Sequence, residues 1–149
     1  MKLIFLDTEA TGADLKKDRL SQVSYLIDET IRTEYFKPPV PMSIKAMAIT
    51  HITNKMLEDK PPFKGSDMEK ELSTILKDNI LVAHNVAFDA GMLETEGVEV
   101  GKTICTLRVA RHMDVDAIIP EYNLQYLRYY LELDIDGGAH DAEMDVRVL

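Results

Sequence analysis

The order of apolar and polar positions predicts a group of strands at the start of the chain. Residues 2–7 are Lys-Leu-Ile-Phe-Leu-Asp, and four consecutive apolar residues that end in an acid are typical of a buried central strand. A turn is expected over 8–12. Residues 20–27 and 30–36 contain many β-branched and aromatic side chains, which predicts two further strands joined by a short turn. Short connections between neighbouring strands predict an antiparallel meander.

Helical spacing begins after the prolines near residue 40. Ser43 is a suitable N-cap for a short helix that ends at Ile49, and Thr53 for a second helix that ends before Pro61. From Asp67 onward, apolar residues recur every three or four positions. Further strands are expected over 80–83 and 103–106, and further helices over 87–94, over 107–113, after Asn123, and from near His140 to Leu149. Strands that alternate with helices after a meander predict an α/β fold with a mixed sheet.

Length and composition indicate one folded domain. The 149 residues fit a single domain over 1–149. Apolar residues make up 46% and charged residues 29%, which excludes a disordered or fibrous chain. Cys105 is the only cysteine, so no internal disulfide can form. No apolar run approaches the roughly 20 residues that a membrane span needs, and the expectation is a cytoplasmic domain without membrane contact.

The charge narrows the range of partners. A formal net charge of −9 argues against broad contact with phosphates. An acidic protein still binds polyphosphates when cations lie between its carboxylates and the phosphates. Binding of phosphates by this chain would therefore require acidic residues that lie close enough together to hold cations.

Asp7 and Glu9 are the first candidates for such a cluster. They occupy positions i and i+2 of an extended segment, so both carboxylates point to one face. Two acids this close repel each other, and a bound cation would remove the repulsion. The alternative is a solvated strand end that carries two acids. Gly12 serves either the turn or the close approach of a ligand.

Two later segments place polar residues at the start of a helix. Asn85 and Asp89 are either site residues or, respectively, a helix cap and an ordinary first-turn acid. His140 precedes Asp145 by five residues. On one continuous helix the two side chains would point about 140° apart, so they share a cleft only when His140 lies before the helix. The alternative is that His140 is a surface histidine.

The order of these three segments resembles the exonuclease motifs of the DEDDh family, the 3′–5′ exonucleases similar to the proofreading subunit of bacterial DNA polymerase. The motifs are Asp-x-Glu after the first strand, Asn-x-x-Phe-Asp midway and His-x4-Asp in the last helix. The stretches most similar to the exonuclease X branch are 40–49, 52–53 and 104–111. The resemblance covers nearly the whole chain and implies a ribonuclease H-like fold.

The resemblance also implies a metal site and a pocket for the end of a strand. The family's four metal-binding carboxylates fall on Asp7, Glu9, Asp89 and Asp145, and its general base falls on His140. The nucleotide-binding positions fall on Ala10, Thr11, Gly12, Thr50, His51, Asn85 and Phe88. Members of the branch carry histidine where this chain has Thr50, and His51 comes one residue later.

The chemistry of these residues fits the implied activity. Carboxylates without a Cys or His cluster suit two Mg²⁺ ions, with Mn²⁺ as a substitute, rather than zinc. Two such ions about 3.5–4 Å apart bind both the attacking and the leaving oxygen of an in-line displacement. His140, with a reference pKa of about 6.5, would take the proton of the attacking water. The resemblance therefore implies release of nucleoside 5′-monophosphates from nucleic acid 3′ ends, of DNA in preference to RNA.

Two other functions fit part of the sequence. A haloacid dehalogenase-like phosphatase begins with a similar strand and an Asp-x-Asp-x-Thr motif, but the His-x4-Asp ending has no role in that scheme. A ribonuclease H-like module that binds strand ends without cutting would lack a ligand, whereas here every catalytic position is filled. The acidic surface predicts a weak grip on the strand, which leaves a role for a protein partner or a homodimer.

The last predicted helix is short. Residues 141–149 are fewer than the mean helix length of about 11–12 residues, and Val146, Val148 and Leu149 require a buried face. We therefore expect the chain to be truncated in its C-terminal helix, with a frayed last turn. Asp145 would then be the least firmly placed of the four carboxylates.

Overall fold

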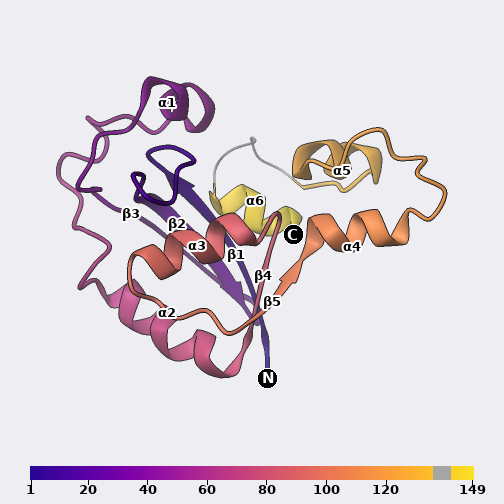
Figure 1. Cartoon of the computed structure of the whole chain (residues 1–149), viewed down its shortest axis with the longest axis horizontal. Helices are drawn as coiled ribbons and strands as arrows, with labels where there is room; N and C mark the ends of the chain where they lie inside the picture. Colours follow the sequence, from indigo (N-terminus) through magenta and orange to yellow (C-terminus); the bar gives the residue numbers. More distant parts are fainter. Residues whose placement is uncertain (136–141) are drawn as a thin grey trace.

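A mixed five-stranded sheet in the order β3-β2-β1-β4-β5 lies at the centre of the protein (Figure 1). The computed structural model describes residues 1–135 and 142–149. Strands β1, β2 and β3 pair antiparallel, and β4 and β5 extend the sheet in parallel from β1. The strand bounds are Leu3–Ala10 (β1), Leu20–Ile27 (β2), Thr30–Tyr35 (β3), Ile80–Ala83 (β4) and Lys102–Cys105 (β5). The predicted α/β fold with a mixed sheet is confirmed.

The helices of the described residues begin at side-chain caps in three cases. Their bounds are Ile44–Thr50 (α1), Asp67–Asp78 (α2), Ala87–Thr95 (α3), Thr106–Met113 (α4), Leu124–Tyr130 (α5) and Ala142–Val148 (α6). The side-chain oxygens of Ser43, Ser66 and Asn123 each accept a hydrogen bond from the backbone N–H three residues later. The predicted caps at Ser43 and Asn123 are confirmed. None of these helices has the length and apolar character that a membrane crossing requires.

Side chains along β1 alternate between the two faces of the sheet. Ile4 and Leu6 are fully buried in the main hydrophobic core, together with the apolar residues of α2 and α3. Asp7 and Glu9 occupy the intervening register, which places them toward the face on which α6 packs against β1, β2 and β3. The central strand thus separates the apolar core from the carboxylates.

The turn predicted over 8–12 is wrong in its first part, because β1 continues to Ala10. Pairing with β2 extends to the Ala10↔Leu20 pair, with an irregularity between Glu9 and Ala10. The polar residues of this segment suggested a turn, but the ladder with β2 satisfies their backbone groups. Asp7 and Glu9 are therefore held within a paired strand.

The helix predicted after Thr53 is also wrong. Backbone hydrogen bonds join residues three apart, such as Met56 N–H to the Thr53 oxygen at 3.0 Å, so the segment is a run of turns. The Asn54 side chain accepts a hydrogen bond from Met42 N–H at 2.8 Å. Leu57 is buried in a small apolar cluster that also contains Met42. These tertiary contacts outweigh the weak helical preference of a short segment.

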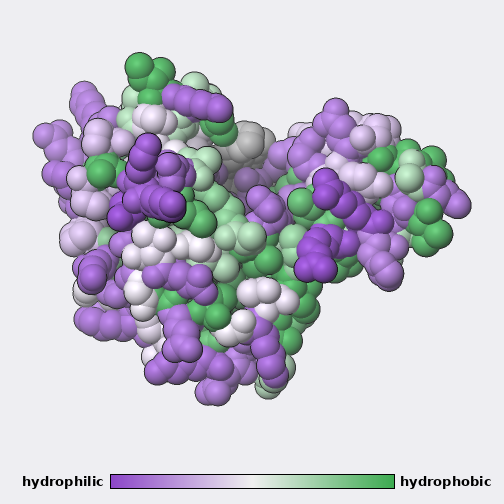
Figure 2. All heavy atoms as spheres, in the orientation of Figure 1, coloured by the Kyte–Doolittle hydropathy of each residue, from purple (hydrophilic) through white to green (hydrophobic). Residues whose placement is uncertain are grey.

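Helices α4 and α5 extend to one side of the sheet (Figure 1). His84, at the end of β4, joins them: its Nδ1 lies 2.9 Å from Thr106 Oγ1, and its Nε2 donates to the Tyr122 carbonyl oxygen at 2.7 Å. Burial lowers the pKa of the His84 imidazole, which favours the neutral form. Figure 2 shows apolar side chains on this lobe, where Met113 and Val115 are exposed by 74% and 87%.

Leu72→Ala tests the packing of α2 on the sheet. Leu72 is fully buried in the main core, so the change should lower the free energy of unfolding by about 2–5 kcal/mol. Ile44→Ala, at a position that is 83% exposed, should change it by no more than about 0.5 kcal/mol. Urea denaturation measures both values. Equal effects of the two changes would contradict the described core.

Candidate active site

Carboxylates from opposite ends of the described chain meet on one face of the sheet. Asp7 and Glu9 come from β1, and Asp145 comes from α6. One ligand oxygen from each residue lies within 4.8 Å of the others. Asp145 is only 7% exposed, and the other two side chains are partly buried. The structure thus brings together three of the four predicted carboxylates, which we call the acid cluster.

Two glutamines fix the position of α6, the helix that carries Asp145 of the acid cluster. Gln22, the register partner of Glu9 on β2, accepts a hydrogen bond from Ala142 N–H at 3.3 Å. Gln125 of α5 donates from Nε2 to Asp145 Oδ1 at 2.6 Å. The first contact spans 120 residues and the second joins two successive helices, so the position of Asp145 depends on the completed fold.

A buried arginine orients the second of these glutamines. Arg128 is 5% exposed, and its Nη1 donates to Gln125 Oε1 at 3.3 Å. Because the amide oxygen accepts from Arg128, the amide nitrogen of Gln125 points toward Asp145. Such outer hydrogen bonds fix the orientation of a carboxylate that binds a metal.

Asp89 lies on α3 and is not part of the acid cluster. Its Oδ1 accepts hydrogen bonds from Thr8 N–H at 3.0 Å and from Thr8 Oγ1 at 2.8 Å. Thr8 is the residue between Asp7 and Glu9, so this contact ties Asp89 to the strand that carries the cluster. Asp89 is only 2% exposed, and burial raises the pKa of its carboxyl to about 7 although the Thr8 hydrogen bonds act in the opposite direction. It is therefore not an ordinary solvated first-turn acid.

The interpretation of Asn85 as a helix cap is wrong. The residue before α3 is Val86, and no side chain caps this helix. Asn85 is exposed and has a φ of 65°, and its carbonyl oxygen accepts from Phe88 N–H at 3.0 Å. Asparagine adopts this left-handed conformation more readily than most residues. Asn85 therefore shapes the turn between β4 and α3 through its backbone.

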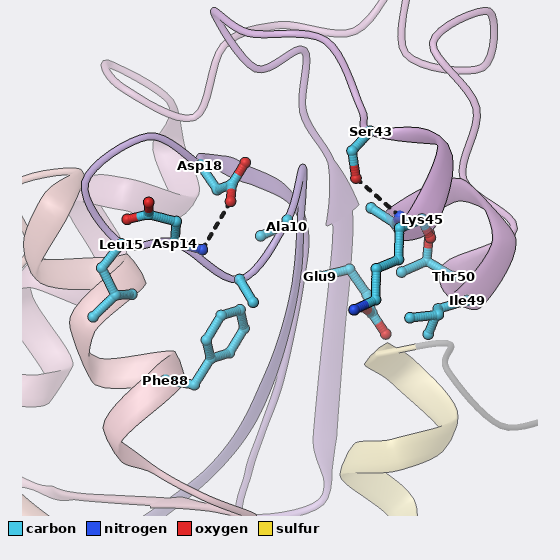
Figure 3. A pocket seen from close by; sticks show the side chains of 13 residues that line it. Glu9, Ala10, Asp14, Leu15, Asp18, Ser43, Lys45, Ile49, Thr50 and Phe88 are labelled. Carbon is cyan, nitrogen blue, oxygen red and sulfur yellow. Dashed lines mark hydrogen bonds between the residues drawn. The ribbon is translucent and has the colours of Figure 1, made fainter.

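A pocket of 830 Å³ opens beside Glu9 (Figure 3). The end of β1 and the loop that follows it form one wall, α1 forms another, and Phe88 of α3 contributes an aromatic ring. Leu15, Ile49 and Phe88 make part of the lining apolar. Glu9 belongs both to this pocket and to the acid cluster, so the two features form one continuous site.

The predicted nucleotide-binding residues divide into two groups. Those that line the pocket are Ala10, Gly12, Thr50 and Phe88. Those outside the described lining are Thr11, His51 and Asn85. Thr11 is fully buried and donates from Oγ1 to Asp18 Oδ1 at 2.8 Å. His51 is an exposed residue at the C-terminal end of α1, with a φ of 59°.

Gly12 allows the loop after β1 to fold closely upon itself. A Cβ atom at this position would lie 2.4 Å from Asp18 Oδ2. The Asp18 carboxylate cannot move away freely, because it also accepts hydrogen bonds from Thr11 Oγ1 and from Asp14 N–H. Gly12 thus serves the tight loop after β1, which is the first of its two predicted roles, and its role in the close approach of a ligand stays a prediction.

Sequence reasoning missed several residues around the site. Thr8 could have been noticed as a polar residue on the apolar side of β1, but no local pattern marks Gln22, Gln125 or Lys45, which lines the pocket. The predicted general base, His140, lies outside the described residues. Its role therefore stays a prediction.

A mixed sheet that carries converging carboxylates beside a pocket of this size fits a nuclease of the ribonuclease H-like class. The family model RNase_T, described as an exonuclease, matches residues 4–149. The chain belongs to this exonuclease family, and it is a 3′–5′ exonuclease domain. The predicted resemblance to the DEDDh exonucleases is confirmed.

Relatives of known function share this domain. DNA polymerase III subunit epsilon of Treponema pallidum is 31% identical, with 95% of this chain and 70% of that protein covered. The epsilon subunit of Buchnera aphidicola subsp. Acyrthosiphon pisum is 30% identical, with 83% and 62% covered. The 3′-5′ exonuclease DinG of Bacillus subtilis is 26% identical, with 99% and 16% covered. This chain thus spans only part of each relative.

Solved structures agree with the fold. Exonuclease X in complex with 5′ overhanging duplex DNA matches 98% of this chain and 85% of its own, with a TM-score of 0.75 and 25% identity. Exonuclease I of E. coli in complex with a dT13 oligonucleotide matches 99% of this chain and 39% of its own, with a TM-score of 0.80 and 18% identity. The predicted ribonuclease H-like fold is therefore confirmed.

Asp89→Asn tests the burial of the fourth carboxylate. Because the folded pKa of about 7 lies above the usual value of 3.8, the folded state holds a proton here that the unfolded chain has lost. This group therefore lowers stability as the pH rises from about 4 to 7. Asparagine keeps the acceptor for Thr8 and does not titrate. Between pH 5 and pH 8, the free energy of unfolding of the variant should therefore rise by about 2 kcal/mol relative to that of wild type.

Urea denaturation in metal-free buffer with EDTA at the two pH values measures this gain. Asp116→Asn, at an exposed position, is the control and should show no gain. A constant difference between Asp89→Asn and wild type would contradict the raised pKa.

Proposed function

We propose that this domain hydrolyses the last phosphodiester bond at the 3′ end of a DNA strand and releases a nucleoside 5′-monophosphate. The observation that carries the proposal is that Glu9 belongs both to the acid cluster and to the pocket lining. A terminal nucleotide in the pocket would place its phosphodiester bond beside the carboxylates. DNA in the solved exonuclease X complex supports DNA as the substrate class.

The donor set fits divalent cations. Carboxylate oxygens within 4.8 Å of one another repel, and they are the hard ligands that Mg²⁺ and Mn²⁺ prefer. We propose that Asp7, Glu9 and Asp145, together with Asp89, hold two Mg²⁺ ions, which Mn²⁺ can replace. When bound, the ions would stabilise the attacking and leaving oxygens of the phosphodiester.

The remaining residues have proposed roles in binding and proton transfer. His140, five residues before Asp145, would act as the general base that takes the proton of the attacking water. Ile49 and Phe88 would contact the base and sugar of the terminal nucleotide from opposite walls of the pocket. Gln125 would keep the Asp145 carboxylate oriented through its 2.6 Å hydrogen bond.

The acidic surface bears on partners and alternatives. With a net charge of −9, the protein holds a strand mainly at its end, so we propose that a partner protein or a second copy increases retention on DNA. Membership of the exonuclease family removes the support for the phosphatase alternative. A module that only binds ends is distinguished by the assay that follows.

A cleavage time course tests the proposed function. Oligonucleotides labelled at the 5′ end, of DNA and RNA, single-stranded and duplex, are incubated with Mg²⁺ or with EDTA. The expected result is stepwise shortening of DNA from the 3′ end, with nucleoside 5′-monophosphate as the product and no reaction in EDTA. Cuts in circular single-stranded DNA would contradict the proposal, and binding without any shortening would support the end-binding module.

Asp7→Asn should abolish cleavage and weaken metal binding, because it removes a ligand and also relieves repulsion in the acid cluster. In wild type, Mg²⁺ at 100 times its Kd should raise the free energy of unfolding by about 2.7 kcal/mol. The variant should show much less stabilisation by Mg²⁺. Exposed Asp116→Asn is the matched control and should retain both properties. Full activity of Asp7→Asn, or of wild type in EDTA, would refute the metal site.

His140→Ala should lower turnover by roughly 10²–10⁴-fold, the usual contribution of a general base. Stabilisation by Mg²⁺ should persist, since His140 is not proposed as a ligand. Wild-type turnover should rise with pH as the proposed base loses its proton, and the variant should lose this rise. His112→Ala, on the exposed end of α4, is the control. A near-normal rate of His140→Ala at neutral pH would show that another group is the base.

A further inference from the structure

Lys45 brings a positive charge into the pocket beside the acid cluster. It lies in the first turn of α1, and its side chain extends toward Glu9 across the pocket (Figure 3). Among the described lining residues it is the only cationic side chain, whereas Glu9, Asp14 and Asp18 are acidic. The described lining therefore has one positively charged side chain at the junction with the acid cluster.

The carboxylates of the loop after β1 do not explain the presence of Lys45. Lys45 forms no ion pair with the described residues. Asp18 accepts hydrogen bonds from Thr11 Oγ1 and Asp14 N–H, and the Asp14 carboxylate lies 3.8 Å from Lys17 Nζ. The carboxylates of this loop are thus occupied within the loop itself.

Helix stability does not explain Lys45 either. A cation in the first turn opposes the helix dipole, and α1 has no acidic residue in that turn to compensate. Lys45 is exposed, so it contributes little apolar burial to the fold. A residue that breaks a local rule without a structural gain is a candidate for a functional role.

We propose that the Lys45 ammonium binds a phosphate group at the 3′ end of the strand. An ammonium on a flexible stem is a point charge suited to phosphate oxygens, and phosphate is the anionic group that a nucleic acid brings into this pocket. The proposal rests on the proposed function, because it takes the pocket as the site of the terminal nucleotide. It adds a positively charged contact to a site whose other lining charges are negative.

Two phosphates could be the ligand of Lys45. One is the phosphodiester that is cleaved, which becomes the 5′-phosphate of the released nucleotide. The other is a phosphate on the 3′ oxygen of the terminal nucleotide, as found on strands that do not end in a free hydroxyl. Both offer the same oxygen ligands, and small nucleotides distinguish them.

Binding of three compounds to the full chain in Mg²⁺ tests the proposal: thymidine, thymidine 5′-monophosphate and thymidine 3′,5′-bisphosphate. Isothermal titration measures Kd for wild type, Lys45→Met and Lys45→Arg, with Lys77→Met on α2 as the matched control. Lys45→Met should raise the Kd of a phosphate-bearing compound roughly 10-fold, the usual scale for the loss of a hydrogen bond to a charged group. Lys45→Arg should restore most of the affinity, and Lys77→Met should match wild type.

The pattern of losses identifies the ligand. A loss for the 5′-monophosphate assigns Lys45 to the cleaved phosphodiester, and a loss for the bisphosphate alone assigns it to a 3′-phosphate. The proposal is overturned if Lys45→Met weakens the binding of thymidine as much as that of the nucleotides, or if it weakens the binding of none of the three compounds. If wild type binds none of the three, the pocket is not a nucleotide site, and the Lys45 contact fails together with the proposed function; binding by wild type without any loss in Lys45→Met overturns the Lys45 contact alone.

Discussion

The close approach of like charges on β1 and α6 is the constraint on which the site depends. Two unit charges about 4 Å apart repel by about 4 kcal/mol at the effective dielectric constant typical of partly buried pairs. Asp7 and Glu9 cannot separate because both lie in the ladder with β2, opposite Ser24 and Gln22. Asp145 cannot withdraw because α6 packs on the same sheet and Gln125 binds its carboxylate. The packing energy of the domain thus keeps carboxylates together that would separate in a looser structure.

The central strand also connects the two sides of the sheet chemically. Its apolar face is anchored in the main core by Ile4 and Leu6, and Thr8 continues this face as a polar residue. Through the amide and hydroxyl of Thr8, the strand binds Asp89 of α3. A displacement of α3 would therefore act on the residue that separates Asp7 from Glu9. Packing in the core and geometry in the acid cluster are coupled through a single residue.

Local patterns predicted most of the fold, whereas the contacts around the site required the structure. The apolar runs of β1 and β4 and the caps at Ser43 and Asn123 depend on neighbouring residues, so they could be predicted from sequence. The motif order indicated the cluster of Asp7, Glu9 and Asp145. Local composition failed at 8–12, where the pairing with β2 decides the conformation. The contact of Thr8 with Asp89 joins residues 81 apart, and that of Gln125 with Asp145 joins residues 20 apart on two successive helices, so the pattern within a single element cannot predict either.

The distance along the chain between the parts of the acid cluster has a consequence for biosynthesis. The contact between Gln22 and Ala142 spans 120 residues, so during synthesis it can form only after most of the chain has been made. A nascent chain that has formed β1, β2 and β3 but not yet α6 holds only Asp7 and Glu9 of the cluster. A chain interrupted during translation before Asp145 would lack the third carboxylate of the acid cluster, and under the proposed function it would have no nuclease activity.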